Sequence, residues 1–240
     1  MAAITAHFPA REVFARYAQS GKWFNDAGQL HSTEQIAAEW YQSQGYDVKT
    51  WANSFIQTCV ATFLAPVIQD PGDPELVGGM RRSSRGWFKD HSKAPIISVA
   101  HPADFGSVKY YQRRSKELSD WFERLNLSDS LGELFEELLE KGTSLRDYLW
   151  VNEDYAVELA RTALRIIPKE TVLRCMQWTI EHYWDRRVGW PNLFVYENNR
   201  FLFVKSQYSS LSQDHVNWFQ WAAKSNMPFE ICRVKKRDTI

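Results

Sequence analysis

Residues 189–206 read GWPNLFVYENNRFLFVKS, and this stretch decides the fold. The runs 193–196 and 200–206 are rich in the aromatic and β-branched residues that favour strands. Three residues, Glu197-Asn198-Asn199, join the two runs. Asparagine tolerates the left-handed backbone of a tight turn, so the stretch predicts a β-hairpin.

Residues on both sides of this hairpin carry a helical pattern. Downstream, we expect a helix from Ser212 to about Lys224 and a strand over Phe229–Val234. Upstream, the apolar spacing predicts four helices, at residues 108–125, 131–140, 154–167 and 170–186. The pattern predicts an α/β (α+β) fold with a helical front and a small mixed sheet near the end of the chain.

The first part of the chain carries clear start and stop signals. Ser32 and Gln35 form a capping-box pattern, and Gly45 offers a stop, so we expect a helix of about 12 residues. A second helix begins near Ser54 and either ends near Pro66 or kinks there and runs on to about residue 68. Prolines, glycines and arginines over residues 70–100 predict an irregular basic loop.

Composition restricts the class of protein. Lys plus Arg and Asp plus Glu both number 29, so the net charge is zero and any nucleic-acid contact needs a local basic face. Cys59, Cys175 and Cys232 are far apart, which favours reduced core thiols over a disulfide or a zinc site. Since no run approaches the ~18 apolar residues of a membrane span, we expect a cytoplasmic protein.

We expect residues 1–30 to be an N-terminal extension and residues 31–240 to be a single domain. Within that domain, residues 31–187 are mainly helical, and residues 188–240 form a core of hairpin, helix and strand.

The last part of the chain resembles the VRR-NUC nuclease family of the PD-(D/E)xK superfamily. The matching pieces are Gly-Trp-Pro-Asn at 189–192, Phe-Val-Lys at 203–205, Leu-Ser at 211–212, Trp218, and Pro-Phe-Glu-Ile-Cys-Arg-Val at 228–234. Residues 34–41 and 102–114 are similar to segments of the Fanconi-anaemia-associated nuclease. The resemblance implies a nuclease-type core on which the helical front packs.

The resemblance also implies a catalytic metal site in which Mg²⁺ or Mn²⁺ activates water for phosphodiester hydrolysis. The family places an Asp on the first strand, a Glu-x-Lys on the second, and a further Glu on a helix. These positions correspond here to Asn192, Phe203, Lys205 and Glu34. Two carboxylates are thus replaced, and only Glu34 remains as a candidate metal ligand.

The second strand also allows a register shifted by two residues, in which the triplet becomes Lys205-Ser206-Gln207. We prefer the Phe203 register because it needs no gap before Leu211. Neither register restores a carboxylate. A displaced ligand is another route to catalysis, from Glu197 in the turn or from Glu181 or Asp185 before the hairpin, although a solvated surface is the plainer interpretation of all three.

Clusters of basic residues are candidates for contacts with DNA phosphates. The positions are Arg81, Arg82, Arg85, Arg113, Arg114, Arg186 and Arg187, the last two directly before the hairpin. A cluster of this kind is also typical of an ordinary solvated face. The histidines, His215 among them, show no metal or triad spacing, and we expect structural roles for them.

Three hypotheses follow. In the first, which we favour, the chain is a pseudonuclease that binds branched or double-stranded DNA, or a protein partner, without cleavage or cofactor. In the second, it is an active nuclease that uses Mg²⁺ or Mn²⁺ with Glu34, Lys205 and a displaced acid. In the third, it is a regulator or immunity-type protein that binds a true nuclease.

Overall fold

The computed structural model describes residues 8–82 and 95–237. The chain divides into two compact units, with unit 1 formed by Met1–Asn53 and Val188–Ile240 and unit 2 by Ser54–Arg187. This division differs from the sequence-based one, which placed residues 1–30 outside a single domain. The reason is that residues 10–32 supply three strands to the sheet of unit 1.

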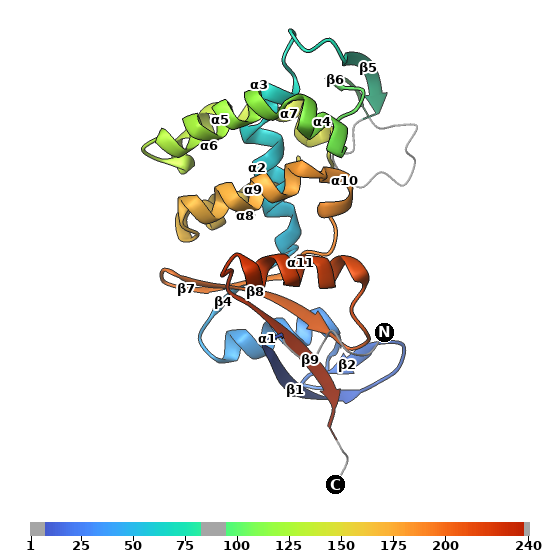
Figure 1. Cartoon of the computed structure of the whole chain (residues 1–240). Coiled ribbons are helices and arrows are strands. Elements are labelled where there is room, and N and C mark those ends of the chain that lie inside the picture. Colours follow the sequence, from blue (N-terminus) through green and yellow to red (C-terminus); the bar gives the residue numbers. More distant parts are fainter. Residues whose placement is uncertain (1–7, 83–94, 238–240) are drawn as a thin grey trace. The chain divides into compact units, whose positions relative to one another are not determined.

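In the described part of unit 1, seven strands form one mixed sheet in the order β3-β2-β1-β9-β8-β7-β4 (Figure 1). Strand β9 is parallel to its neighbours β1 and β8, and the other pairs are antiparallel. The predicted α/β class is confirmed, although the sheet is larger than expected. The strands are β1 (Ala10–Tyr17), β2 (Lys22–Phe24), β3 (Leu30–Ser32), β4 (Asp47–Thr50), β7 (Leu193–Glu197), β8 (Arg200–Gln207) and β9 (Phe229–Lys236).

The predicted hairpin of β7 and β8 is confirmed. Glu197 pairs with Arg200, so Asn198 and Asn199 form the turn. Asn198 has φ +52°, the left-handed conformation expected of an asparagine in a tight turn. Both faces of β7 are covered, since Leu193, Phe194 and Val195 are all buried.

Helix α1 (Thr33–Ser43) covers one face of the sheet, and the predicted capping box begins it. Ser32 Oγ accepts a hydrogen bond from the Gln35 amide at 3.1 Å, and the Gln35 side chain accepts one from the Ser32 amide at 2.8 Å. The helix buries Ile36, Ala37 and Tyr41 against alternate residues of β1, β7, β8 and β9.

Helix α11 (Gln213–Lys224) lies on the opposite face of the sheet from α1 (Figure 1). The contact is largely aromatic: Phe203 of β8 lies 5.9 Å from Trp218 of α11 and 5.7 Å from Phe194 of β7, measured between ring centroids. Trp218 also meets Phe229 of β9 at 5.9 Å. Strands β8 and β9 therefore lie between two cores, an aliphatic one under α1 and an aromatic one under α11.

Unit 2 is mainly helical, and the predicted helices are confirmed with added breaks. The helix breaks next to Pro66 as expected, with Leu64 between α2 and α3 and Pro66 in the first turn of α3. Arg114 separates α4 from α5, and α7 was not predicted. The helices are α2 (Ala52–Phe63), α3 (Ala65–Ile68), α4 (Val108–Arg113), α5 (Ser115–Leu127), α6 (Leu131–Leu139), α7 (Thr143–Tyr148), α8 (Asp154–Ile166), α9 (Lys169–Glu181) and α10 (Tyr183–Arg186).

The expectation of an irregular loop over residues 70–100 was wrong for two parts of that segment. Strand β5 (Leu76–Arg82) pairs antiparallel with β6 (Ile96–Pro102). Gly78 and Gly79 were interpreted as chain breakers, yet both lie inside β5. The β-branched residues Ile96, Ile97 and Val99 indicate strand β6, but the glycines and prolines around them led us to expect a loop.

Other sequence-based expectations concern the cysteines and membrane insertion. Cys59, Cys175 and Cys232 are buried free thiols, as predicted. Within residues 8–82 and 95–237, the helices all fall short of the length and apolar character that a bilayer crossing demands.

A network of ion pairs lies inside unit 2. Arg113 contacts Asp104 at 2.8 Å and Asp73 at 2.7 Å, and Arg114 contacts Asp70 at 2.8 Å. The Asp73 side chain is fully buried, with 0% exposure. Hydrogen bonds from Arg113 lower the pKa of Asp104, and those from Arg114 lower the pKa of Asp70. The network joins the junction between α4 and α5 to the segment before β5.

Removing a member of this buried network is expected to be costly. Asp73→Ala removes the buried carboxylate that Arg113 and Arg114 share. We expect a loss of about 3 kcal/mol in the free energy of unfolding. Asp120→Ala is the matched control, because Asp120 pairs with Lys116 on the surface at 3.8 Å. We expect the control to cost less than about 1 kcal/mol. Urea unfolding at pH 7 measures the free energy of unfolding of both variants. Equal losses in Asp73→Ala and Asp120→Ala would contradict a contribution from the buried network.

Candidate functional site

Asn192 stands directly before β7 and is held there by two hydrogen bonds. Its Oδ1 accepts a bond from the backbone amide of Ser206 at 2.9 Å, and its Nδ2 donates to Ser206 Oγ at 2.7 Å. The backbone carbonyl of Asn192 also accepts a bond from the Ala52 amide at 3.3 Å. The side-chain amide thus joins the beginning of β7 to the end of β8 and uses both of its polar atoms in doing so.

Strand pairing determines which residues of β8 lie near Asn192. Leu193 pairs with Val204 in the antiparallel register, so Asn192, directly before β7, lies at the same end of the hairpin as Lys205 and Ser206. Phe203 and Lys205 are two residues apart in β8 and belong to the same face of the strand. The alignment with Phe203 at the Glu position and the one with Lys205 there both stay predictions.

Phe203 lies away from this point, opposite Phe194 and inside the aromatic core. Its side chain has 0% exposure and packs on Trp190 and Trp218. A group at this position has no path to a substrate. Phe203 therefore contributes to packing against α11.

Lys205 is a partly buried cation, and its surroundings act on it in two directions. Burial lowers the pKa of the Lys205 ammonium below its usual value, and the negative charge of Glu34 opposes that shift. Glu34 lies in the first turn of α1 and is half-buried. Glu34 is thus the carboxylate whose charge acts on Lys205.

His215, in the first turn of α11, is also part of this group, although sequence analysis gave it a structural role. Its Nδ1 lies 2.7 Å from Ser212 Oγ, the N-cap of α11. Burial, together with the nearby charge of Lys205, lowers the pKa of His215 to about 4, and Asp214 acts in the opposite direction. The N-terminal turns of α1 and α11 thus both lie within electrostatic range of Lys205.

Position 189, on the approach to β7, requires a glycine. Its φ is +78°, and a Cβ built there would lie 2.4 Å from the backbone of Asp214. The chain entering β7 is therefore in close contact with the first turn of α11. Trp190 follows and is buried against Phe203 and Trp218.

The displaced acids suggested from sequence have other surroundings. Glu197 is at the far end of β7, five residues from Asn192, a separation of about 17 Å along an extended strand. Glu181 is ion-paired with Arg186, and Asp185 contacts His182 at 2.8 Å, both within unit 2. The structure thus offers no support for Glu197 as a rescuing ligand.

The basic residues proposed for phosphate contacts have varied surroundings. Arg113 and Arg114 belong to the ion-pair network of unit 2, where carboxylates already engage both guanidinium groups, and Arg114 is only 6% exposed. Arg186 donates to the Trp178 carbonyl at 2.6 Å, and Arg187 lies 5.0 Å over the ring of Trp184. The backbones of Arg81 and Arg82 lie in β5, and Arg85 lies outside the described residues.

The group around Lys205 fits an anion better than a hard divalent cation. Proteins hold magnesium through one or two carboxylates together with water and substrate phosphates. Here Asn192 is neutral and its polar atoms are already bonded to Ser206, which leaves Glu34 as the carboxylate of the group. Within the described ranges, no set of three or more His, Cys, Asp and Glu side chains is arranged to hold a metal. A cationic side chain beside two helix N-termini, by contrast, suits a phosphate.

Comparison with known proteins supports the fold. No protein-family profile matches the chain, and no curated protein matches it either. Two solved structures of paFAN1 are similar, one bound to a 5′-flap DNA with a 2-nucleotide flap and a gap, the other to one with a 1-nucleotide flap and a gap. The TM-scores are 0.64 and 0.66, and the identities 17% and 16%. Each match covers 98% of this chain and 39% of the other, so this chain spans about two fifths of the length of paFAN1. The mixed α/β fold is that of the FAN1 nuclease domain.

The lowered pKa of His215 predicts how the stability of the protein depends on pH. The usual pKa of histidine is 6.5 and the folded value is about 4, so the unfolded chain takes up a proton first as the pH falls. The contribution of His215 to stability is complete above pH 6.5 and is lost as the pH falls towards 4. We expect His215→Gln to lose less stability than the wild type between pH 6.5 and 4.5, as measured by urea unfolding.

The carboxylates of Asp70 and Asp104 also titrate in acid, but they are present in both proteins and cancel in this comparison. Parallel stability curves for the two proteins would contradict the lowered pKa of His215.

Proposed function

We propose that this chain is a DNA-binding protein that uses a nuclease fold without cleaving DNA. The proposed ligand is branched or double-stranded DNA, bound through its phosphates. The contact at its centre is the group formed by Glu34, Asn192, Lys205, Ser206 and His215, which we call the Lys205 site. Neither Mg²⁺ nor Mn²⁺ is part of the proposal.

A single observation carries this proposal. Asn192, which stands where the resemblance expects a carboxylate, is bonded through both polar atoms to Ser206, the residue after Lys205. Because the amide is neutral and Lys205 is a cation, the pair repels a divalent metal ion. The same pair attracts the phosphate to which that ion would have been bound.

The fold supports DNA as the ligand. The two structures of paFAN1 were solved with 5′-flap DNA, and their likeness to this chain extends over 98% of its length. The net charge of zero means that binding depends on a local site and not on the field of the whole molecule. Substitution of Lys205 should therefore have a large effect on affinity.

The test is a titration of fluorescent flap, splayed and plain duplex DNA with the full chain. We expect Lys205→Ala to weaken binding by roughly 10- to 100-fold, since a hydrogen bond to a charged group contributes about 1.5–3 kcal/mol. The salt dependence of the logarithm of the affinity should fall by about one unit of slope. Lys224→Ala, which removes the same charge at the exposed C-terminal end of α11, is the matched control and should change affinity less than about twofold.

Cleavage is measured with the same DNA in Mn²⁺. We expect intact DNA with the wild type and with both variants. Cleavage by the wild type that Lys205→Ala abolishes would overturn the proposal and favour a metal-dependent nuclease. Equal affinity of Lys205→Ala and Lys224→Ala would remove the Lys205 site from DNA binding and leave the protein-binding hypothesis.

A further inference from the structure

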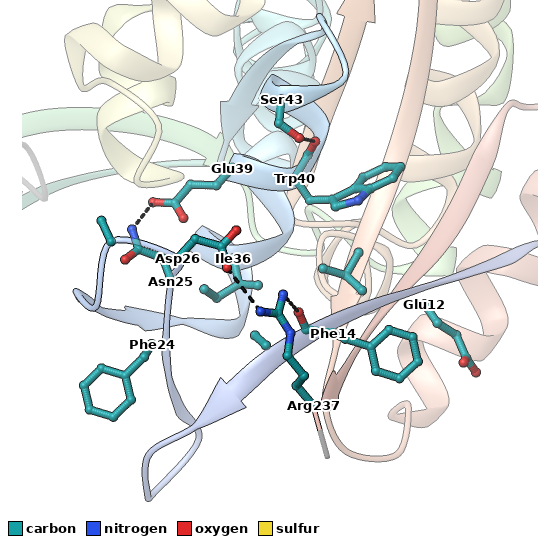
Figure 2. Close-up of a pocket in the computed structure, with 13 residues that line it drawn as sticks. Glu12, Phe14, Phe24, Asn25, Asp26, Ile36, Glu39, Trp40, Ser43 and Arg237 are labelled. Atoms are coloured by element: carbon teal, nitrogen blue, oxygen red, sulfur yellow. Dashed lines mark hydrogen bonds and ion pairs between the residues drawn. The ribbon is translucent and has the colours of Figure 1, made fainter. Parts of the chain in front are cut away.

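The sheet of unit 1 has two faces, and the face turned away from α1 is open over part of its area. Val13 of β1 points into the core under α1. Neighbouring residues of a strand point to opposite faces, so Phe14 lies on the other face. Figure 2 shows Glu12 and Phe14 on the opposite side of β1 from Trp40 of α1. Phe14 is 50% exposed, so this part of the face is accessible to solvent.

Four cationic side chains of β1, β2 and β9 lie on this open part. Strand pairing places them there, because Arg16 is opposite Phe24 and Lys235 is opposite Phe14. The other two cations are two residues away, from Phe24 on β2 and from Lys235 on β9, and residues two apart in a strand share a face. The basic face, as we call it, consists of Phe14, Arg16, Lys22, Phe24, Arg233 and Lys235.

Carboxylates do not cancel the charge of the basic face. Glu12, on the same face of β1, pairs with Lys235. Asp26, in the turn after β2, contacts Arg237 at 3.4 Å, so this pair adds no net charge. Asp214 lies at the start of α11 on this side of the sheet. Even when Glu12 and Asp214 are both counted, the four cations leave the basic face positive.

Most of these cations are also available to a ligand. Among the described residues, Arg16, Lys22 and Arg233 have no carboxylate partner. The guanidinium of Arg16 lies 4.5 Å over the ring of Phe24 instead. An arginine stacked in this way keeps the donors at its edge free for a phosphate. An anion can therefore bind here without first breaking an ion pair of the protein.

The four cations form a diagonal row across three strands. Arg233 and Lys235 are two residues apart on β9, which is about 7 Å. Arg16 is one strand over and two residues further along than Lys235, a step of about 8 Å, and Lys22 stands in the same relation to Arg16. The row is thus about 22 Å long with nearly even steps. Even steps of this size are comparable with the spacing of successive phosphates in an extended nucleic-acid strand.

Two aromatic rings lie beside this row, both on its β2 side. Phe14 is opposite Lys235, and Phe24 is opposite Arg16. The bases of a duplex are already stacked on one another, whereas the bases of an unpaired strand stack on exposed rings next to cations. The combination of a cation row with the half-exposed ring of Phe14 therefore favours an unpaired strand over a duplex.

We propose that the basic face binds single-stranded DNA, with phosphates along the row of cations and a base stacked on Phe14. The guanidinium of Arg16 offers a second stacking surface next to it. The choice of DNA rests on the proposed function, whereas the residues that bind differ from those of the Lys205 site.

The test is a titration of a labelled oligothymidylate of twelve nucleotides with the full chain, followed by fluorescence anisotropy. Phe14→Leu keeps an apolar side chain and removes the ring, and it should weaken binding roughly five- to 50-fold. Its affinity for plain duplex DNA should stay the same. Tyr46→Leu is the matched control, because it removes a 37% exposed ring beside β4, at the far end of the sheet. We expect the control to change affinity less than about twofold.

A second pair of variants tests the charges. Lys22→Gln and Lys49→Gln each remove an exposed lysine, from β2 and from β4. Lys22→Gln should reduce the slope of the logarithm of affinity against the logarithm of salt by about 0.7, and Lys49→Gln should leave it unchanged. In the Lys205→Ala background, Phe14→Leu should weaken oligothymidylate binding by the same factor, so the two proposals fail separately.

Four outcomes would overturn the proposal. They are no binding of oligothymidylate by the wild type, equal affinity of the wild type and Phe14→Leu, equal salt slopes for Lys22→Gln and Lys49→Gln, and displacement of the oligonucleotide by phosphatidylserine vesicles at equal phosphate concentration. The last would mean that an anionic membrane occupies the basic face.

Discussion

The Lys205 site depends on the register of one hairpin. The turn at Asn198 and Asn199 pairs Leu193 with Val204, and this pairing brings Asn192 next to the last residues of β8. The amide of Asn192 then closes the open end of the hairpin by bonding to Ser206 at 2.7 and 2.9 Å. An aspartate could accept from the same amide and hydroxyl of Ser206, so what distinguishes the asparagine here is its lack of charge.

Two cores hold this hairpin in place and determine what surrounds its open end. The aliphatic core under α1 fixes the first turn of that helix and thus Glu34, while the aromatic core under α11 fixes His215 through Trp218. Gly189 allows the chain to pass in contact with Asp214, so the entry to β7 and the start of α11 stay together. The polar residues of the site are therefore positioned by packing that none of them contributes to.

Much of this arrangement could be predicted from local signals. A few neighbouring residues encode the capping box at Ser32, and a few encode the turn at Asn198. The order of hairpin, helix and strand also follows from local patterns, so these features could be predicted without knowledge of distant contacts. Strand β1 pairs with β9, more than 200 residues away in the chain, and β2 and β3 extend the sheet from β1, so these strands carry little local signal. The pairing of β7 with β8 could have been predicted, because the asparagines at 198 and 199 already indicate a tight turn between the two runs. His215 was missed because its role depends on burial beside Lys205, which spacing does not reveal.

The most direct measurement of the central claim is a titration of isotope-labelled protein with Mn²⁺, followed by nuclear magnetic resonance at the side-chain amide of Asn192 and the backbone amide of Ser206. If these residues form a structural bond beside a cation, micromolar Mn²⁺ leaves both signals unbroadened, and duplex DNA shifts the Ser206 signal. Selective broadening of Asn192 and Ser206 by micromolar Mn²⁺ would mean that a metal binds among these residues, and it would contradict a metal-free Lys205 site.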